Sequence, residues 1–271
     1  MARLDEPGQW QLEGSSAELY QRYLVPAVAS IWAGDLVARV CLPEAARVLD
    51  VACGTGVVAR SAAARVGPLG RVTGIDVNRS MLEVARSVPP VQGAPVEWCE
   101  ASVLAMPFAA AEYDVALCQF GLQFFPERPA AMREIRRVLV PAGVVALSVF
   151  SAIERNPVAH ALSDALDRIE PGSSAAKRSE HVLADVDDLR AVVVGAGFHN
   201  PVIETATKLA RYPSVEDYVH IQLSATPLAS LEIRERTAAA LIEELETKLA
   251  GYVGPDGFVF PQEAHILLAR A

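Results

Sequence analysis

The sequence contains few aromatic residues and fewer basic than acidic ones. Phe, Trp and Tyr make up 6% of its 271 residues. Its 24 Lys and Arg residues stand against 33 Asp and Glu residues, which gives a formal net charge of −9. Nucleic-acid binding depends on clustered Lys and Arg at phosphate groups, and the sequence has no such basic cluster. We therefore expect no nucleic-acid partner.

Cysteine is also scarce, and the histidines are scattered. Four cysteines are present and none forms a C-x-x-C pair, which argues against a zinc site and against a disulfide framework. No two histidines have an H-x-x-x-H metal-binding spacing. We predict no metal site and a reducing, cytoplasmic location.

Long apolar runs are missing as well. The longest uncharged apolar stretch, residues 138–153, contains Pro141 and Gly143 and is shorter than the roughly 20 residues of a membrane span. The start, MARLDEPGQW, has no apolar core, so we expect no secretory signal. Hydrophobic residues nevertheless make up 52% of the chain, enough for a large buried core.

Between residues 44 and 150, short Val- and Ile-rich segments alternate with helical segments of about ten residues. The apolar segments are RVLDVA, RVTGID, VEWC, YDVALCQF and VVALSVF. This alternation predicts a parallel sheet with crossover helices. Before it, we expect a loose arm over residues 1–14 and a helix that starts at Ser15, with Glu18 at capping-box spacing. Pro26 should interrupt or kink that helix, and a second helical stretch should cover residues 28–40.

After residue 150 the pattern is less regular. We predict helices at 156–169 and 185–195, a strand at 202–207, a mostly helical segment at 213–249 and a closing strand in HILLARA. An apolar stripe on the second helix of that segment indicates core packing, and comprises Ile233, Thr237, Leu241, Leu245 and Leu249. The expected fold is α/β; a Rossmann-like, seven-stranded, mostly parallel sheet with its last strand antiparallel is what the family resemblance described below implies. Residues 1–43 would form N-terminal cap helices, and residues 44–271 the main domain with a helical insert at 213–250.

A strand-to-helix turn after the first strand carries the clearest chemical signal. Gly54, Thr55 and Gly56 would let the backbone approach a ligand at the N-terminus of the next helix. With Ala59 they match G-x-G-x-x-A, a pattern that is weak by itself. Asp76 ends the second strand 20 residues after Gly56, where a carboxylate can hold both ribose hydroxyls of an adenosine.

Asp50 distinguishes between cofactors that share this pattern. It lies four residues before Gly54, at the mouth of the turn. A carboxylate there would repel a pyrophosphate and attract a cationic amino group and a sulfonium. The position therefore favours an adenosyl sulfonium over a nicotinamide dinucleotide, although Asp50 could instead cap the amides of the loop.

Several motifs in order resemble the class I S-adenosylmethionine-dependent methyltransferases, in particular the menaquinone/ubiquinone-type small-molecule branch. They are VLDVACGTG, GIDVNRSMLEVAR, WCEASVLAMPF, YDVALCQFGLQFF and REIRRVLVPAG, over residues 46–150. The N-terminal segment WQLEGSSAELYQRYLVPAVASIWA and the closing HILLAR resemble that branch less specifically. The resemblance implies an S-adenosylmethionine cofactor and methyl transfer to a small, apolar, quinone-like or secondary-metabolite acceptor.

The resemblance also implies roles for individual residues. The turn would wrap the methionine part of the cofactor, Asp76 would hold the ribose, and Val77 with Met81 would flank the adenine. Gln119 would lie near the sulfonium. The full set of expected cofactor-binding residues is Tyr20, Asp50, Ala52, Gly54, Thr55, Gly56, Asp76, Val77, Met81, Ala101, Ser102, Val103 and Gln119.

The sequence departs from the family pattern at two positions. Ser102 stands where an Asp normally accepts a hydrogen bond from the adenine amino group, so that contact should be weaker. Ala142 replaces the first glycine of a common P-G-G turn, and we expect a local change of that turn without loss of activity.

The acceptor side is less defined. A general base is needed only if the acceptor must lose a proton, and the candidates are His160, His181 and His220, with His160 and His220 as tentative catalytic residues. An aromatic group at Phe120, Phe124 and Phe125 favours an apolar acceptor. We expect the insert, with Tyr218 and His220, to close over the cleft together with an N-terminal helix that carries Leu19 and Tyr23.

Two other functions remain open. Because Ser102 weakens the expected adenine contact, the chain could bind S-adenosylmethionine without catalysis or use it for chemistry other than methylation. The glycine turn would also suit an NAD-dependent oxidoreductase, against which Asp50 and the later motifs argue. The sequence leaves the acceptor and a homodimer undecided.

Overall fold

The computed structural model describes residues 15–231 and 235–271. The arm expected at residues 1–14 and Ile233 of the apolar stripe therefore lie outside the described residues. Within them, eight strands form one sheet in the order β3-β2-β1-β4-β5-β8-β6, with β7 on β8. The strands are β1 (Arg47–Val51), β2 (Arg71–Asp76), β3 (Val96–Glu100), β4 (Tyr113–Gln119), β5 (Leu139–Phe150), β6 (His199–Tyr212), β7 (Val253–Gly254) and β8 (Gly257–Arg270).

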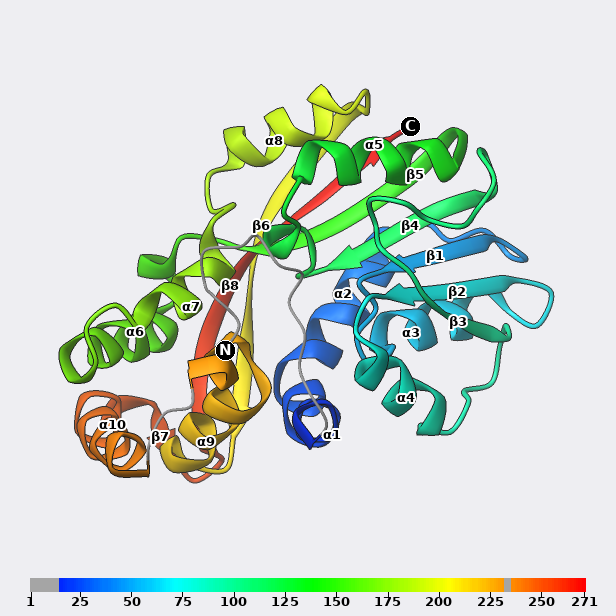
Figure 1. The fold of residues 1–271 in the computed structure, drawn as a ribbon. Helices are drawn as coiled ribbons and strands as arrows, with labels where there is room; N and C mark the ends of the chain where they lie inside the picture. The colour runs from blue at the N-terminus through cyan, green and yellow to red at the C-terminus, as the bar shows by residue number, and fades with distance from the viewer. Residues whose placement is uncertain (1–14, 232–234) are drawn as a thin grey trace.

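The first five strands pair in parallel, and β8 lies antiparallel between β5 and β6 (Figure 1). The predicted Rossmann-like sheet with an antiparallel last strand is confirmed. The two-residue β7 adds an eighth strand to the seven that we expected. Because the carboxyl ends of β1, β2, β4 and β5 share one edge, the loops that follow them meet there.

Helices cover both faces of the sheet. They are α1 (Ser15–Leu19), η1 (Tyr20–Ala29), α2 (Ser30–Arg39), α3 (Val57–Val66), α4 (Arg79–Ser87), α5 (Arg128–Val138), α6 (Pro157–Ile169), α7 (Ser174–Arg178), α8 (Val186–Gly195), α9 (Val215–Ala225) and α10 (Glu235–Lys248). Short turns are η2 (Leu122–Phe124), η3 (Ile153–Arg155), η4 (Ser179–His181), η5 (Pro227–Leu231) and η6 (Ala250–Tyr252). Successive strand residues point to opposite faces, so Val48 packs with α2 and α3, whereas Leu49 packs with α5 and α8.

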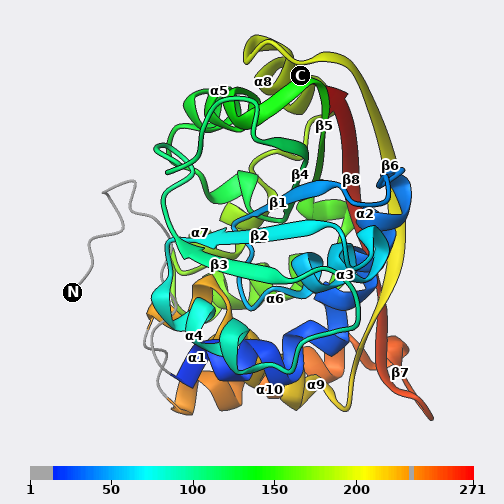
Figure 2. The same cartoon turned by 90° about the vertical axis from the view of Figure 1, so that its right-hand side faces the viewer.

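Strands β6 and β8 are much longer than the sequence pattern indicated. Each has 14 residues, and they pair from His199 with Arg270 to Tyr212 with Phe258. Their far ends pass beyond the parallel strands and lie beside α9 and α10 (Figures 1 and 2). Leu241 and Leu245 of α10 are fully buried on this side, as the apolar stripe predicted.

Pro26 does not break the N-terminal helix. The segment Tyr20–Ala29 widens into a π-helix with Pro26 inside it, and the helix continues as α2. The Ser30 N–H donates to the Val25 carbonyl, the five-residue spacing of a π-helix. The wider turn accommodates a residue that cannot donate a backbone hydrogen bond.

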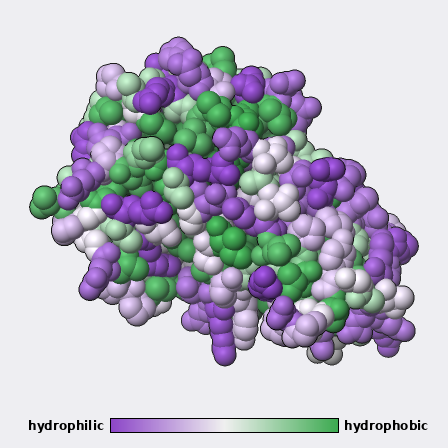
Figure 3. All heavy atoms as spheres, turned by 180° about the vertical axis from the view of Figure 1, so that it is seen from behind, coloured by the Kyte–Doolittle hydropathy of each residue, from purple (hydrophilic) through white to green (hydrophobic). Residues whose placement is uncertain are grey.

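The surface seen from behind mixes hydrophilic and hydrophobic residues and is not divided into a polar and an apolar half (Figure 3). Among residues 15–231 and 235–271, no helix combines the length and apolar character needed to cross a membrane.

Candidate active site

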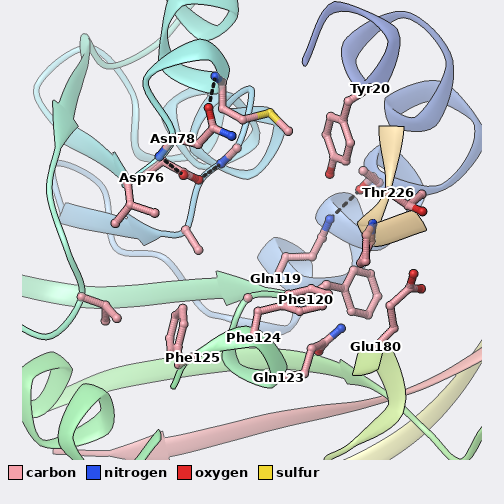
Figure 4. Close-up of a pocket in the computed structure, with 18 of the residues that line it drawn as sticks. Tyr20, Asp76, Asn78, Gln119, Phe120, Gln123, Phe124, Phe125, Glu180 and Thr226 are labelled. Atoms are coloured by element: carbon pink, nitrogen blue, oxygen red, sulfur yellow. Dashed lines mark hydrogen bonds between the residues drawn. The ribbon is translucent and has the colours of Figure 1, made fainter. Parts of the chain in front are cut away.

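A pocket with about 1260 Å³ of empty space, part of it open to solvent, lies at the carboxyl ends of β1, β2 and β4 (Figure 4). The loops after these strands form its floor, η1 forms one wall, and the residues between α9 and η5 form another. The described lining residues are Tyr20, Leu24, Val28, Ala29, Ala52, Gly54, Ile75, Asp76, Val77, Asn78, Met81, Ala101, Val103, Gln119, Phe120, Gly121, Gln123, Phe124, Phe125, Pro126, Phe150, Glu180, Ala225, Thr226 and Pro227.

The turn after β1 requires glycine for two separate reasons. Gly54 and Gly56 have φ angles of +53° and +84°, in the left-handed region that most side chains avoid. A Cβ on Gly56 would lie 2.1 Å from the ring of Trp98, which comes from β3. A side chain at position 56 would therefore clash with Trp98 and also strain the backbone.

Asp76 ties the second strand to this turn. One carboxylate oxygen accepts a hydrogen bond of 2.8 Å from the Gly54 N–H, and the other accepts one of 2.8 Å from the Asn78 N–H. Burial raises the pKa of Asp76, while these backbone donors oppose the shift. The Asn78 side chain then accepts from the Met81 N–H and caps α4.

Asp50 lies below the pocket and is 1% exposed. Its carboxylate accepts a hydrogen bond of 2.8 Å from the Ala59 N–H in the first turn of α3. Burial raises its pKa to about 8, against the effect of that bond and of nearby Arg60. Asp50 therefore bonds one backbone amide of α3. The expected attraction between Asp50 and a cationic cofactor stays a prediction.

Two residues without glycine's freedom have strained backbones at the floor of the pocket. Ala52 follows β1 with a φ of +54°, and Phe120 follows β4 with a φ of +53°. Left-handed backbone in residues other than glycine is uncommon and is concentrated at functional sites. Both residues line the pocket, at the ends of neighbouring strands.

The end of the pocket away from Asp76 is aromatic. The rings of Phe120 and Phe150 stack with centroids 4.1 Å apart and an interplanar angle of 6°. Trp32 packs edge-on against Phe120 at 5.7 Å. Phe124 and Phe125 also line the pocket.

Several buried polar atoms of the lining have no partner within the described protein. They are Gln119 Oε1, both amide atoms of Gln123, and Glu180 Oε1. Gln119 is nevertheless fixed in place, because its Nε2 donates to the Ala29 carbonyl at 3.0 Å. Buried polar groups normally find partners, so a ligand that reached these atoms would supply a missing hydrogen bond.

The charges of the lining are of one sign. Among the described lining residues, Asp76 and Glu180 are acidic, and none is Lys, Arg or His. A site of this kind suits a ligand with cationic groups better than one with phosphate groups.

The structure brings most of the predicted cofactor residues together. Nine line the pocket: Tyr20, Ala52, Gly54, Asp76, Val77, Met81, Ala101, Val103 and Gln119. The lining does not include Asp50, Thr55, Gly56 or Ser102. Asp50 and Gly56 shape the turn from behind, and the Ser102 hydroxyl accepts from the Leu104 N–H at 3.2 Å.

Burial next to Asp76 and Asp50 raises the pKa of Tyr20 to about 12, so its phenol stays protonated.

The two histidines predicted as tentative catalytic residues do not lie in this lining. His160 is paired with Asp164 at 3.6 Å and His220 with Glu216 at 3.7 Å, and their side chains are 38% and 57% exposed. Their positions on the outer faces of α6 and α9 argue against the prediction, because a general base must reach the acceptor. Tyr218 is buried among Tyr212, Phe258 and Phe260, also outside the lining.

His181 lies closer to the pocket. Its Nδ1 is 2.6 Å from the Ser151 carbonyl, and its ring packs against Phe150. Burial lowers its pKa, which favours the neutral ring. Its neighbour Glu180 enters the lining, and the sequence offered no signal for that residue.

Residues 48–143 match the family model described as "Methyltransferase domain". Over these residues the chain is similar to a methyltransferase domain. Among curated relatives, a 2-phytyl-1,4-naphtoquinone methyltransferase of Thermosynechococcus vestitus is 37% identical over 45% of this chain and 53% of its own length. A ubiquinone/menaquinone biosynthesis C-methyltransferase of Ralstonia nicotianae is 34% identical over 45% and 51%.

The chain spans about half the length of the curated relatives it matches. Among solved structures, the YcgJ protein of Bacillus subtilis has a TM-score of 0.58 at 17% identity, over 88% of this chain and 97% of its own. That likeness supports the fold. The predicted resemblance to the methyltransferases is confirmed for the domain that contains the glycine turn, Asp76 and Gln119.

Proposed function

We propose that this protein transfers a methyl group from S-adenosylmethionine to a small, largely apolar acceptor that contains a flat ring. One observation carries the proposal: a single pocket in a methyltransferase domain joins an acidic end at Asp76 to an aromatic end at Phe120 and Phe150. The first end suits a cationic nucleoside, and the second suits an apolar ring.

The residues of the acidic end fit the cofactor. Asp76 would hold the ribose hydroxyls, Val77 and Met81 would flank the adenine, and the Gly54 turn would admit the methionine part. The buried, unpartnered Gln119 Oε1 supplies an acceptor for its amino group. When bound, S-adenosylmethionine supplies an electrophilic methyl group.

The chain's own contribution is alignment and exclusion of water. Tyr20 and Leu24 from η1, with Thr226 and Pro227 from the insert, border the same pocket. Ala17, Met81 and Ala229 also pack with Tyr20, which links α1, α4 and η5 at one side of the pocket. These contacts support a cap over the main domain formed by the described residues 15–43, 213–231 and 235–250. Tyr218 and His220, which the lid prediction placed over the cleft, lie outside the lining.

The acceptor class rests on the aromatic end and on the relatives. Two of the relatives are named as quinone methyltransferases. A naphthoquinol has the size and flat shape that stacked Phe120 and Phe150 would contact. The four cysteines of the chain are free, which suits a reducing compartment such as the cytoplasm.

The test is transfer of a labelled methyl group from S-adenosylmethionine. The acceptor panel contains a reduced short-chain 2-alkyl-1,4-naphthoquinone, simple phenols and amines. Binding of S-adenosylhomocysteine and binding of NAD are measured by calorimetry in parallel. We expect labelled product from a ring-containing acceptor with equimolar S-adenosylhomocysteine. Cofactor binding without transfer to any acceptor would favour non-methylation chemistry, and binding of NAD alone would favour the oxidoreductase.

A further inference from the structure

Glu180 is an acidic residue whose position the methyltransferase motifs do not explain. It lies in η4 between α7 and α8, is 8% exposed, and lines the aromatic end of the pocket. In Figure 4 it lies on the side away from Asp76, with Gln119 and Phe120 between the two carboxylates. Glu180 thus lies at the end of this pocket away from Asp76, and it also lines a second, smaller cavity with Lys177, His181 and Gln222.

A buried network holds Glu180 in place. Its Oε2 accepts a hydrogen bond of 2.7 Å from Lys177 Nζ, and Lys177 Nζ also donates to Gln222 Oε1 of α9 at 2.9 Å. Lys177 and Gln222 are each 5% exposed. The carboxylate therefore cannot rotate freely to find another partner.

The second carboxylate oxygen is the unusual feature. Glu180 Oε1 is buried and has no hydrogen-bond partner within the described residues. A buried charged oxygen without a donor is unfavourable, which makes it a strong acceptor for a donor on a ligand. Because Lys177 already neutralises the carboxylate, a neutral O–H donor suits it better than a second ammonium group.

The surrounding groups define what carries that donor. Phe150 belongs both to the pocket lining and to the stacked pair with Phe120. The turn η2, which carries Gln123, packs against η4, so a second unpartnered polar group lies on a neighbouring wall. A flat ring with a hydroxyl group satisfies both the aromatic surface and the free oxygen.

We propose that Glu180 Oε1 accepts a hydrogen bond from a ring hydroxyl of the methyl acceptor, and that the acceptor is therefore phenol-like, as a reduced quinone is. This rests on the proposed function, which it deepens. Gln123 is available to hydrogen-bond a second oxygen of the same ring. Glu180 Oε1 would take the hydroxyl proton as the acceptor forms its bond to the methyl carbon, the carbon–sulfur bond breaks and S-adenosylhomocysteine leaves.

The test compares two binding probes that differ in one donor, 1-naphthol and 1-methoxynaphthalene. Their dissociation constants are measured by fluorescence titration, with and without saturating S-adenosylhomocysteine. We expect the wild-type protein to prefer 1-naphthol by about tenfold or more, the scale of a hydrogen bond to a charged group. Equal affinity for the two probes would overturn the proposal.

Two variants assign the preference to Glu180. The double variant Lys177→Met with Glu180→Leu removes both charges together, and we expect no preference between the probes. Glu180→Gln keeps the shape and the contact with Lys177, and we expect the preference to fall about threefold or more. The control Glu216→Gln changes an exposed carboxylate of α9, whose side chain is 63% exposed, and should keep the wild-type preference.

A preference for 1-naphthol that persists unchanged in Glu180→Gln or in the double variant would overturn the proposal. Probe binding does not require methyl transfer, so the result for Glu180 is independent of the labelled-methyl assay. If that assay fails while the probe preference depends on Glu180, the proposed function is wrong and the phenol site stands.

Discussion

The Asp76 carboxylate at the end of β2 accepts a hydrogen bond of 2.8 Å from the backbone N–H of Gly54, in the turn after β1. The contact joins the two features of the sequence that pointed to an adenosyl cofactor. It also gives Asp76 a second role, because the residue proposed to hold the ribose fixes the turn proposed to hold the methionine part. A substitution that removes the Asp76 carboxylate should therefore lower cofactor affinity and loosen the turn after β1 at the same time.

Replacing Asp76 by Ala should weaken S-adenosylhomocysteine binding by roughly 1.5–3 kcal/mol, the scale of hydrogen bonds to a charged group. The variant also leaves the Gly54 and Asn78 N–H groups without their partner. Calorimetric titration measures the loss. The control Asp187→Ala removes the same charge from the exposed start of α8 and should bind normally. Unchanged affinity in Asp76→Ala would remove the ribose assignment.

Replacing Asp50 by Asn should make stability less dependent on pH. The pKa of Asp50 is raised to about 8 in the folded protein from its ordinary value of 3.8, so between these values the folded state binds a proton that the unfolded state does not. Stability contributed by this group is therefore lost as pH rises, by up to about 1.4 kcal/mol per pH unit.

The free energy of unfolding from urea titrations at several pH values measures this effect. The Asn variant should be the more stable protein near pH 7, because its amide oxygen still accepts from the Ala59 N–H and carries no charge. If wild type and variant show parallel pH profiles, Asp50 has the same pKa in the folded and unfolded states and the predicted effect of its burial is wrong.

Replacing Gly56 by Ala should destabilise the protein by about 2 kcal/mol or more. The left-handed backbone alone costs about 1–2 kcal/mol, and the new Cβ would lie 2.1 Å from Trp98. The matched control is Gly34→Ala in the interior of α2, where no atom lies within 4 Å of the added Cβ. That change should stabilise by roughly 0.5–1 kcal/mol. Equal effects in chemical denaturation would contradict the described packing of Trp98 under the turn.

Replacing Ser102 by Asp should preserve or tighten cofactor binding. The Ser102 hydroxyl accepts from the Leu104 N–H, and an Asp carboxylate can make the same local hydrogen bond, so the loop should keep its shape. A carboxylate would also accept the adenine amino group more strongly than a hydroxyl does. A tenfold loss of affinity in a folded variant, measured by calorimetry, would show that residue 102 does not face the adenine.

The cofactor end of the pocket could be predicted from the sequence because its residues follow local rules. A glycine turn after an apolar strand, and an acid at the end of the next strand, have a fixed spacing that the parallel sheet converts into proximity. Tyr20 was predicted from the resemblance, and it reaches the same pocket.

The acceptor end could not be predicted in the same way. Gln123 and Glu180 belong to short turns far apart in the sequence, with no spacing that relates them, and only the packing of η2 against η4 brings them close. The histidines attracted attention because of their chemistry, but His160 and His220 lie on exposed helix faces. Burial, which the sequence does not show directly, separates Glu180, like Asp50, from the exposed carboxylates of the described residues.

The lengths of β6 and β8 were underestimated for a related reason. Most residues of β6 are exposed or half-buried, so its apolar alternation is weak. β8 includes Pro261, which pairs with Leu209 and interrupts the pattern of a central strand. Ala142, which stands where the family pattern has glycine, has a left-handed backbone with a φ of +63°. The expected local change of that turn stays a prediction.

We propose that one pocket holds an adenosyl cofactor at Asp76 and an acceptor at Glu180. A crystal structure of the protein with S-adenosylhomocysteine and 1-naphthol would show both positions at once. In that structure, we expect the ribose hydroxyls to lie within hydrogen-bond distance of Asp76. We also expect the naphthol ring to lie against Phe120 and Phe150, with its hydroxyl on Glu180. An adenosine bound at the aromatic end, or a naphthol outside the pocket, would contradict this proposal.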